Sequence, residues 1–144
     1  MTLKLPSKRT KMKKLFCIFI FLMSYSYAAG NVESITLAKS DKSWDGSTMP
    51  SYPKEAPEIS VLKITIPPHT ELPLHKHPII NAGYMVKGAL KVVTEDNKTL
   101  HLKAGEALIE VVDKWHYGVN EGNEAVEIVV FYAGTKESAY SIKK

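Results

Sequence analysis

The sequence has very little of two residue types, cysteine and arginine. Cys17 is the only cysteine and Arg9 the only arginine, and both lie within the first 28 of 144 residues. A chain with one cysteine forms no internal disulfide, so its fold depends on a packed core. Beyond residue 28 there is no guanidinium for the forked, two-bond recognition of a carboxylate or phosphate.

Positive charge is also scarce outside the first part of the chain. Residues 1–28 contain six Lys or Arg and no Asp or Glu, whereas the remaining residues contain 13 basic and 15 acidic side chains. Proteins that bind nucleic acid draw their affinity from clustered positive charge. The body of the chain therefore gives no support for a nucleic-acid partner.

The first 28 residues predict a secretory signal peptide. A basic segment, residues 1–14, precedes a mostly apolar run at 15–27, and cleavage is expected near Ala28/Ala29. The apolar run is shorter than the roughly 20 residues that a membrane-spanning helix needs. We therefore expect a periplasmic or secreted protein with no stable membrane span after processing. The alternative is a membrane anchor formed by an uncleaved leader.

The rest of the sequence predicts short strands. A first run at 34–38 precedes a loop at 43–60 that is rich in Ser, Pro and Gly. Later apolar or alternating runs lie at 61–66, 74–80, 83–86, 89–95, 98–103, 107–112, 116–119 and 125–133. Asp96 and Asn97 predict a hairpin turn between two of them. This pattern favours an all-β sandwich or barrel, with residues 135–144 as a polar tail or an edge strand.

Three of the five histidines have a spacing that suits metal binding. His75 and His77 are separated by one residue, so on a strand both side chains point to the same face. His116 begins a later strand and can complete a set of three imidazoles, which bind Fe²⁺, Mn²⁺, Ni²⁺ or Zn²⁺ and leave positions for water or substrate. Alternatively, a surface strand holds the pair without any role. We expect His69, in a turn, and His101, on an exposed face, to lie outside the site.

The residues around these histidines resemble the two motifs of the cupin family. The first family motif is G-x5-H-x-H-x3,4-E-x6-G, and the second is G-x5-P-x-G-x2-H-x3-N. The matching positions are His69, His75, His77, Asn81 and Gly88 for the first motif, and Gly105, Val111, Asp113, His116 and Asn120 for the second. The 16 residues between the motifs resemble the short connection of small single-domain cupins.

The resemblance covers about residues 58–134 and implies a double-stranded β-helix, the jelly-roll barrel of the cupins. It implies a single domain after the signal peptide, with residues 29–57 as an N-terminal arm and Pro/Ser-rich loop. Residues 135–144 remain a polar tail. Cupins commonly pair, so the resemblance also implies a homodimer.

The resemblance implies a metal site made of His75, His77, His116 and Asn81. Asn81 stands where the family has a carboxylate ligand, and its amide is neutral. Such a site keeps the full charge of the ion, which predicts weaker metal affinity, a stronger Lewis acid and a preference for an anionic ligand. The alternative is that Asn81 only forms hydrogen bonds in the bend before Gly83.

Other departures from the two motifs, and other residues near them, give weaker predictions about the site. His69, Val111 and Asp113 replace two glycines and a proline of the motifs at turn positions, where loop shape is at stake. Glu106 and Glu110 share a face of their expected strand, and we expect both to face solvent. We expect Trp44 either to cover the barrel mouth or to anchor its loop. Trp115 and Tyr117 either line a pocket or belong to the core. Asn120 is expected to stabilise a turn.

The sequence leaves the function open between two classes. One is an exported enzyme in which a divalent transition metal, held by three histidines, acts on a small and oxygen-rich molecule. The other is a non-catalytic sensor or storage module that binds a metal or a small ligand. A metal-free site with packed histidines ranks third. One fold hosts many chemistries, so the architecture does not choose between them.

Overall fold

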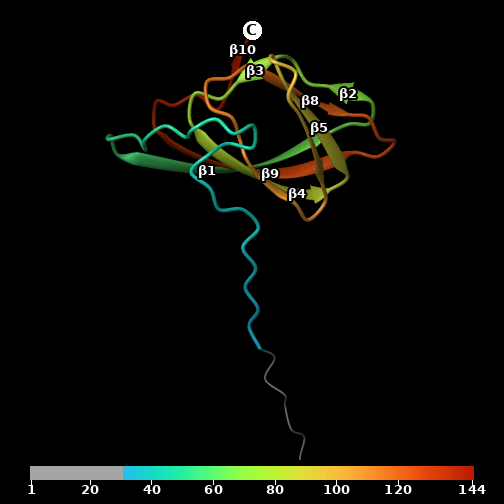
Figure 1. Cartoon of the computed structure of the whole chain (residues 1–144), viewed down its shortest axis with the longest axis horizontal. Helices are drawn as coiled ribbons and strands as arrows, with labels where there is room; N and C mark the ends of the chain where they lie inside the picture. Colours follow the sequence, from blue (N-terminus) through green and yellow to red (C-terminus); the bar gives the residue numbers. More distant parts are fainter. Residues whose placement is uncertain (1–30) are drawn as a thin grey trace, which may run out of the picture. The chain divides into compact units, whose positions relative to one another are not determined.

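Two facing antiparallel sheets make up the computed structural model, which describes residues 31–144. One sheet has the order β1 (Pro57–Ile66), β9 (Val126–Thr135), β4 (Ile80–Lys87) and β7 (Ala107–Ile109). The other has the order β10 (Ile142–Lys143), β3 (His75–Lys76), β8 (His116–Asn120), β5 (Ala89–Thr94) and β6 (Thr99–Lys103), with β2 (Thr70–Glu71) also paired to β8. Figure 1 shows β1, β9 and β4 opposite β3, β8 and β5. The predicted all-β double-stranded β-helix is confirmed.

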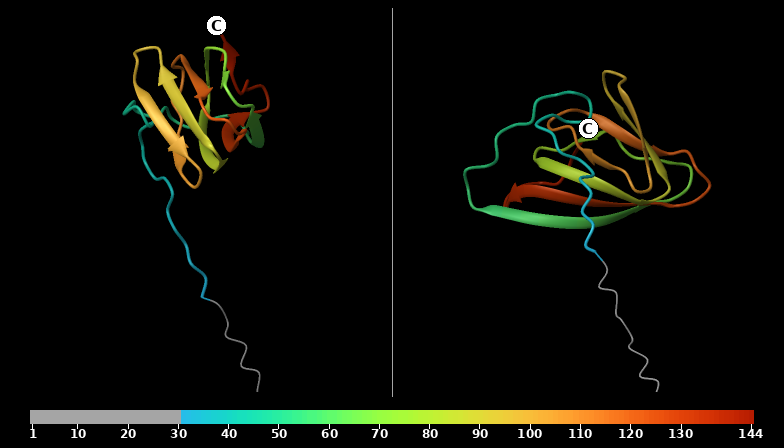
Figure 2. Two further views of the ribbon diagram at one scale, coloured as in Figure 1. Left: turned by 90° about the vertical axis from the view of Figure 1, so that its right-hand side faces the viewer. Right: turned by 60° about the horizontal axis from the view of Figure 1, so that its bottom comes forward.

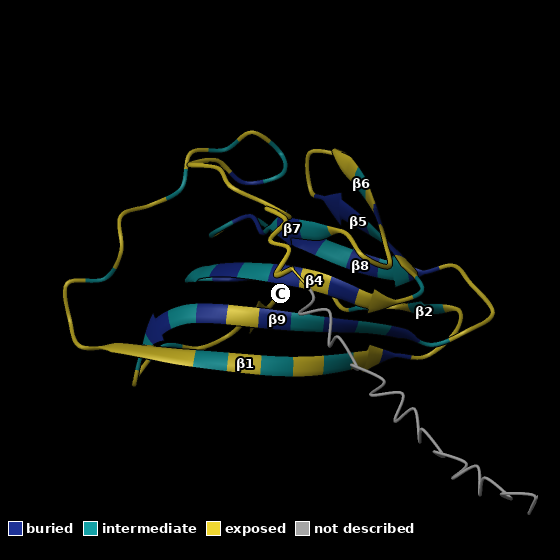
Figure 3. Cartoon of the chain, turned by 90° about the horizontal axis from the view of Figure 1, so that it is seen from below, coloured by how far each residue is buried: buried dark blue, intermediate teal, exposed yellow. Residues whose placement is uncertain are grey.

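Alternating apolar residues build the core between these sheets. Along β1 the side chains of Leu62, Ile64 and Ile66 point inward, whereas Lys63 and Thr65 are exposed. Figure 3 shows this alternation as bands along β1 and β9, which pair over their full length. Burying an aliphatic side chain of this size contributes about 1.5–3 kcal/mol. The core therefore fixes the register that carries the polar residues of the interior.

Three of the sequence expectations about strands need comment. The predicted strand at 34–38 is wrong: these residues are exposed and pair with no described strand, so their apolar side chains gain no burial. The run predicted at 74–80 is broken into β3 and β4 around Pro78, which has no N–H for a ladder. Within residues 135–144, the expected edge strand is observed only at Ile142–Lys143, which form β10 and pair with β3.

The predicted hairpin at Asp96 and Asn97 is confirmed. Strands β5 and β6 pair from Ala89 with Lys103 to Val93 with Thr99, and they are the adjacent yellow and light orange strands in Figure 2. Asn97 adopts a left-handed φ of 63°, which Asn tolerates better than most residues.

All four glycine positions of the two motifs adopt a left-handed backbone. Gly88 and Gly105 have φ values of 80° and 89°, and the replacing residues His69 and Asp113 have φ values of 52° and 54°. For a residue with a Cβ this conformation costs roughly 1–2 kcal/mol. The fold therefore imposes a left-handed backbone at these turns even where glycine is missing.

Asn120 ties three segments together at the end of β8. Its side-chain nitrogen lies 2.8–3.1 Å from the carbonyl oxygens of Ile66, Pro67 and Glu124, and its Oδ1 accepts from the backbone N–H of Gly122 at 3.0 Å. The residue is 1% exposed. These bonds agree with the structural turn role expected for Asn120 and give it no part in the cavity described below.

Residues Ser34–Lys144 form one compact unit. The predicted signal peptide, including Cys17 and the expected cleavage site, lies outside the described residues. Within residues 31–144, no helix is long and apolar enough to cross a membrane.

Candidate metal centre

Three histidine rings converge inside the barrel. His75 on β3 lies directly opposite His116 on β8, and His77 follows β3 and bridges to Val112. The ring centroids are 4.5–5.0 Å apart, and one ring nitrogen from each residue lies within 4.8 Å of the other two. The alternation of a strand places His75 and His77 together, and the β3–β8 pairing adds the third ring. The convergence expected from the spacing is therefore observed.

Backbone carbonyls fix the tautomer of each ring. The Nδ1 atoms of His75, His77 and His116 lie 2.7, 2.7 and 2.9 Å from the carbonyl oxygens of Pro73, Tyr140 and Lys114. A carbonyl oxygen only accepts, so each Nδ1 carries the proton. The lone pair of each neutral ring is then on Nε2, and a second partner that orients a histidine in this way is typical of metal sites.

Burial keeps the three imidazoles neutral. It is the largest influence on the pKa of His75, His77 and His116, and it lowers all three below the ordinary value of 6.5. The Nδ1 hydrogen bonds and the negative charge of Glu110 act in the opposite direction but are outweighed. Near pH 7 the rings therefore offer lone pairs rather than positive charge.

The rings open onto a cavity of about 80 Å³ between the two sheets. Its walls are mostly apolar, and its polar lining consists of His75, His77, Asn81, Glu110, His116 and Tyr132. Asn81 on β4 is 2% exposed, and its Nδ2 donates to the carbonyl oxygen of Ile79 at 3.3 Å. Its side chain thus lines the cavity and also takes part in the local bend, as the hydrogen-bonding interpretation expected.

Glu110 corrects an expectation drawn from the sequence. It was expected to face solvent with Glu106, but Glu110 is only 8% exposed and lines the cavity, with Oε1 3.9 Å from Nε2 of His116. Glu106 is exposed, as expected, and accepts a hydrogen bond from the backbone of Lys103. Leu108, which lies between them and is buried in the core, shows that this face of β7 points inward.

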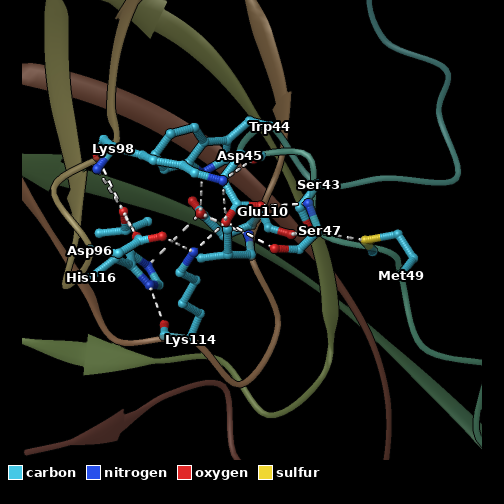
Figure 4. A network of polar contacts seen from close by, with 12 residues as sticks. Ser43, Trp44, Asp45, Ser47, Met49, Asp96, Lys98, Glu110, Lys114 and His116 are labelled. Carbon is cyan, nitrogen blue, oxygen red and sulfur yellow. Dashed lines mark hydrogen bonds and ion pairs between the residues drawn. The ribbon is translucent and has the colours of Figure 1, made fainter.

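The loop before β1 is anchored against Glu110. The indole Nε1 of Trp44 donates to Oε1 of Glu110 at 2.9 Å, and the Ser43 hydroxyl donates to the Glu110 carbonyl oxygen at 2.9 Å (Figure 4). Beside them, Nζ of Lys114 lies 2.6 Å from Asp45. Burial favours a raised pKa for Asp45, but hydrogen bonds from Lys114 and Ser47 outweigh it and hold the pKa at about 2. Trp44 therefore anchors its loop at the site.

A C-terminal strap, residues 138–144, contacts the histidines through β3 and the backbone of Tyr140. The carbonyl oxygen of Tyr140 is the Nδ1 partner of His77, and β10 pairs with β3 opposite His75. The Tyr140 hydroxyl lies 3.0 Å from the hydroxyl of Ser60, and its ring packs on that of Tyr132. Burial raises the pKa of Tyr132 to about 12, so its phenol stays protonated in the cavity.

The remaining candidates lie away from the cavity. His69 and His101 are exposed, as expected. Trp115 and Tyr117 neither line the cavity nor belong to the buried core. The Trp115 ring instead has the ammonium groups of Lys76 and Lys144 at 5.5 and 5.6 Å from its centroid. No motif pointed to Tyr132 or to the Tyr140 carbonyl; an inward position on β9 was the only sequence signal for Tyr132.

The donor set fits a divalent transition metal. Three imidazole nitrogens lie within 4.8 Å of one another, so small rotations of the rings would bring all three to the usual Zn–N distance of about 2.0–2.1 Å from one ion. Neutral imidazoles suit iron, nickel, copper and zinc, and a nearby oxygen donor extends the set to manganese. The residues thus match the needs of such an ion without selecting one metal.

Comparison with known proteins agrees with this architecture. The profile of the family described as "Cupin domain" matches residues 62–132, a segment that contains all three histidines, Asn81 and Glu110. No curated protein sequence matches the chain.

Several solved structures share the fold. A DMSP lyase from Ruegeria pomeroyi DSS-3 aligns with a TM-score of 0.53 and 16% identity, covering 60% of this chain and 43% of that one. A double-stranded beta-helix protein from Klebsiella pneumoniae subsp. pneumoniae aligns with a TM-score of 0.50 and 22% identity, covering 60% and 75%. An oxalate decarboxylase from Lactobacillus farciminis, in complex with formate, aligns with a TM-score of 0.51 and 26% identity. The alignment covers 59% of this chain and 26% of the decarboxylase chain. The chain thus spans less than half of the lyase and about a quarter of the decarboxylase.

The lowered pKa values predict an acid-sensitive metal-free protein. Unfolding returns the three buried imidazoles to a pKa near 6.5, so below that pH the unfolded chain binds more protons than the folded chain. The free energy of unfolding then decreases as the pH falls, by up to about 1.4 kcal/mol per histidine for each unit by which its pKa is depressed. Urea unfolding between pH 7.5 and 5.5 measures this slope.

The exposed His101 provides the matched control for the pH dependence. We expect His116→Asn to reduce the slope and His101→Asn to leave it unchanged. Equal slopes in the wild-type protein and the His116→Asn variant would contradict the assignment of buried, neutral rings.

Proposed function

Because residues 62–132 of this chain form a cupin domain, we propose that the protein binds one divalent transition metal ion through His75, His77 and His116 and acts with it on a small, oxygen-rich molecule. The observation that carries the proposal is the convergence of three neutral rings whose Nδ1 protons are all taken by backbone carbonyls. Packing alone does not require three lone pairs to meet at one point, whereas a metal does.

The cavity supports a ligand of few atoms. Its volume of about 80 Å³ is smaller than the roughly 150 Å³ of a cavity that holds benzene. The walls are mostly apolar, and the Tyr132 hydroxyl can donate a hydrogen bond to a ligand oxygen. A bound ion would supply Lewis-acid polarisation of such an oxygen. The decarboxylase that shares this fold was solved with formate, which supports a short carboxylic acid or dicarbonyl as the ligand.

The second candidate is a non-catalytic module that binds a metal or a small ligand. It is favoured by Asn81, which puts a neutral amide where the family motif has a carboxylate. The two candidates separate when the metal-loaded protein is screened for turnover and O₂ uptake with short sugar acids and diketones. Stoichiometric binding without turnover across the screen would favour the module over the enzyme.

Metal content tests the proposal. Protein purified without a histidine tag should contain about one transition metal ion per chain, by elemental analysis. His116→Ala should lose this metal because it removes one of three donors, whereas the exposed control His101→Ala should retain it. A wild-type protein that is free of metal and also refuses added Mn²⁺, Ni²⁺ and Zn²⁺ would refute the proposal, as would equal metal loss in both variants.

We also propose that the protein is exported to the periplasm or secreted. The basic and apolar segments of residues 1–27 and the small residues before Ala29 support this. N-terminal sequencing of the protein from the periplasm or the medium should begin near Ala29. A start at Met1, together with membrane association, would instead indicate an anchor.

A second copy of the chain is the partner that we propose for the outer face of the β1–β9–β4–β7 sheet. Exposed large apolar side chains on this face include Ile59, Val61, Tyr84 and Phe131, with 40–63% of their surface accessible. Val61 and Phe131 are direct partners across β1 and β9, so the patch is continuous. A two-fold axis places the same apolar patch on both partners, with the Lys63–Glu127 ion pair of the same face beside it.

Size-exclusion chromatography coupled to light scattering tests this pairing. The wild-type chain should have the mass of a dimer, and Phe131→Glu should shift it toward the monomer because a charge would be buried at the interface. Thr99→Glu, at an exposed position of β6 in the other sheet, should leave the mass unchanged. A wild-type monomer at micromolar concentration would contradict the proposal.

A further inference from the structure

We propose that Glu110 supplies to the metal centre the negative charge that is missing at Asn81. The inference rests on the proposed metal site and adds to it a residue at a position that neither motif specifies. Its charge would come from the segment after β7 instead of from β4, where the family motif has its carboxylate.

The two positions are neighbours in the fold. The backbone N–H of Glu110 donates to the carbonyl oxygen of Asn81 at 3.1 Å, and both side chains line the cavity that holds the three rings. A carboxylate at either position therefore reaches the same cavity. The loss of charge at one position and its presence at the other leave one acidic group beside the histidines.

Glu110 has no cationic partner among the described residues apart from the histidines. Within the described residues its one ion-pair contact is with His116, at 3.9 Å, whereas the nearby Lys114 pairs with Asp45 and Asp96. A buried carboxylate without a positive partner is costly. A divalent ion held by the three Nε2 atoms would supply the missing positive charge within the same cavity.

One oxygen of Glu110 is held in place and the other is left free. Oε1 accepts from the indole of Trp44 at 2.9 Å and from the backbone N–H of Val111 at 3.0 Å, and no described residue donates to Oε2 (Figure 4). Both donors are neutral, so they orient the carboxylate without cancelling its charge. Oε1 is also the oxygen that lies 3.9 Å from Nε2 of His116, so the held oxygen faces the rings and Oε2 keeps its capacity to accept from a further group, such as a water bound to the ion. Trp44 is then a positioning residue for Glu110.

Metal titration of matched variants tests the inference. Zn²⁺ and Ni²⁺ are titrated by competition with a chelator into the metal-free full chain. We expect Glu110→Gln to weaken metal binding by about 10–100-fold, the range found for groups that support metal ligands. Glu106→Gln, which removes the same charge from an exposed position four residues earlier, should bind within about 2-fold of the wild-type protein. Trp44→Phe should give an intermediate loss.

A charge swap and a stability measurement separate this role from a structural one. Asn81→Glu combined with Glu110→Gln should recover most of the lost affinity, because the carboxylate returns to the same cavity. Urea unfolding of the metal-free Glu110→Gln variant should show stability equal to or above that of the wild type, because a buried charge has been removed. A purely structural Glu110 would instead lower stability.

The outcomes distinguish the two proposals. A wild-type protein that binds neither metal overturns the metal site and Glu110 together. A wild-type protein that binds metal, with Glu110→Gln and Glu106→Gln equally tight, overturns only the role of Glu110. A swap variant as weak as Glu110→Gln also contradicts the inference. If Glu110→Gln does not fold, Trp44→Phe decides: affinity equal to that of the wild type overturns the inference.

Discussion

The pairing of β3 with β8 is the constraint on which the site depends. It places His75 directly opposite His116, and the two-residue alternation of an extended chain then brings His77 to the same interior. Because the Nδ1 protons are bound by the backbone, ring orientation follows from the main chain rather than from flexible side-chain contacts. The backbone of the barrel therefore sets the direction of the three lone pairs, and the apolar core that fixes the barrel also fixes their position.

The parts of this arrangement that sequence could predict are those set by local periodicity and turn chemistry. Strand alternation identified the face of His75 and His77, and the motif spacing added His116 and Asn81. The turn positions were also readable: His69 and Asp113 stand where the motifs have glycine, and both adopt left-handed backbone. Where local signals misled, the cause was a missing partner, since the run at 34–38 has the composition of a strand but pairs with none of the described strands.

The groups that complete the site depend on long-range contacts, which leave little trace in sequence. Glu106 and Glu110 have the same spacing as two solvent-facing residues, yet only Glu110 turns inward with Leu108. Its partner Trp44 comes from a loop 66 residues earlier. The Tyr140 carbonyl that orients His77 belongs to the backbone, so the residue type at position 140 could not predict this contact. The Pro/Ser-rich loop and the C-terminal strap thus both contact the centre, although their composition predicted only a loop and a polar tail.

X-ray absorption spectroscopy of the metal-loaded protein tests the central claim most directly, because it reads the ligands of the ion itself. The account predicts the multiple-scattering signature of three imidazoles, with nitrogen at about 2.0–2.1 Å for zinc. One or two imidazoles, or an all-oxygen shell, would mean that the ion binds elsewhere and that the three rings serve only the packing of the barrel.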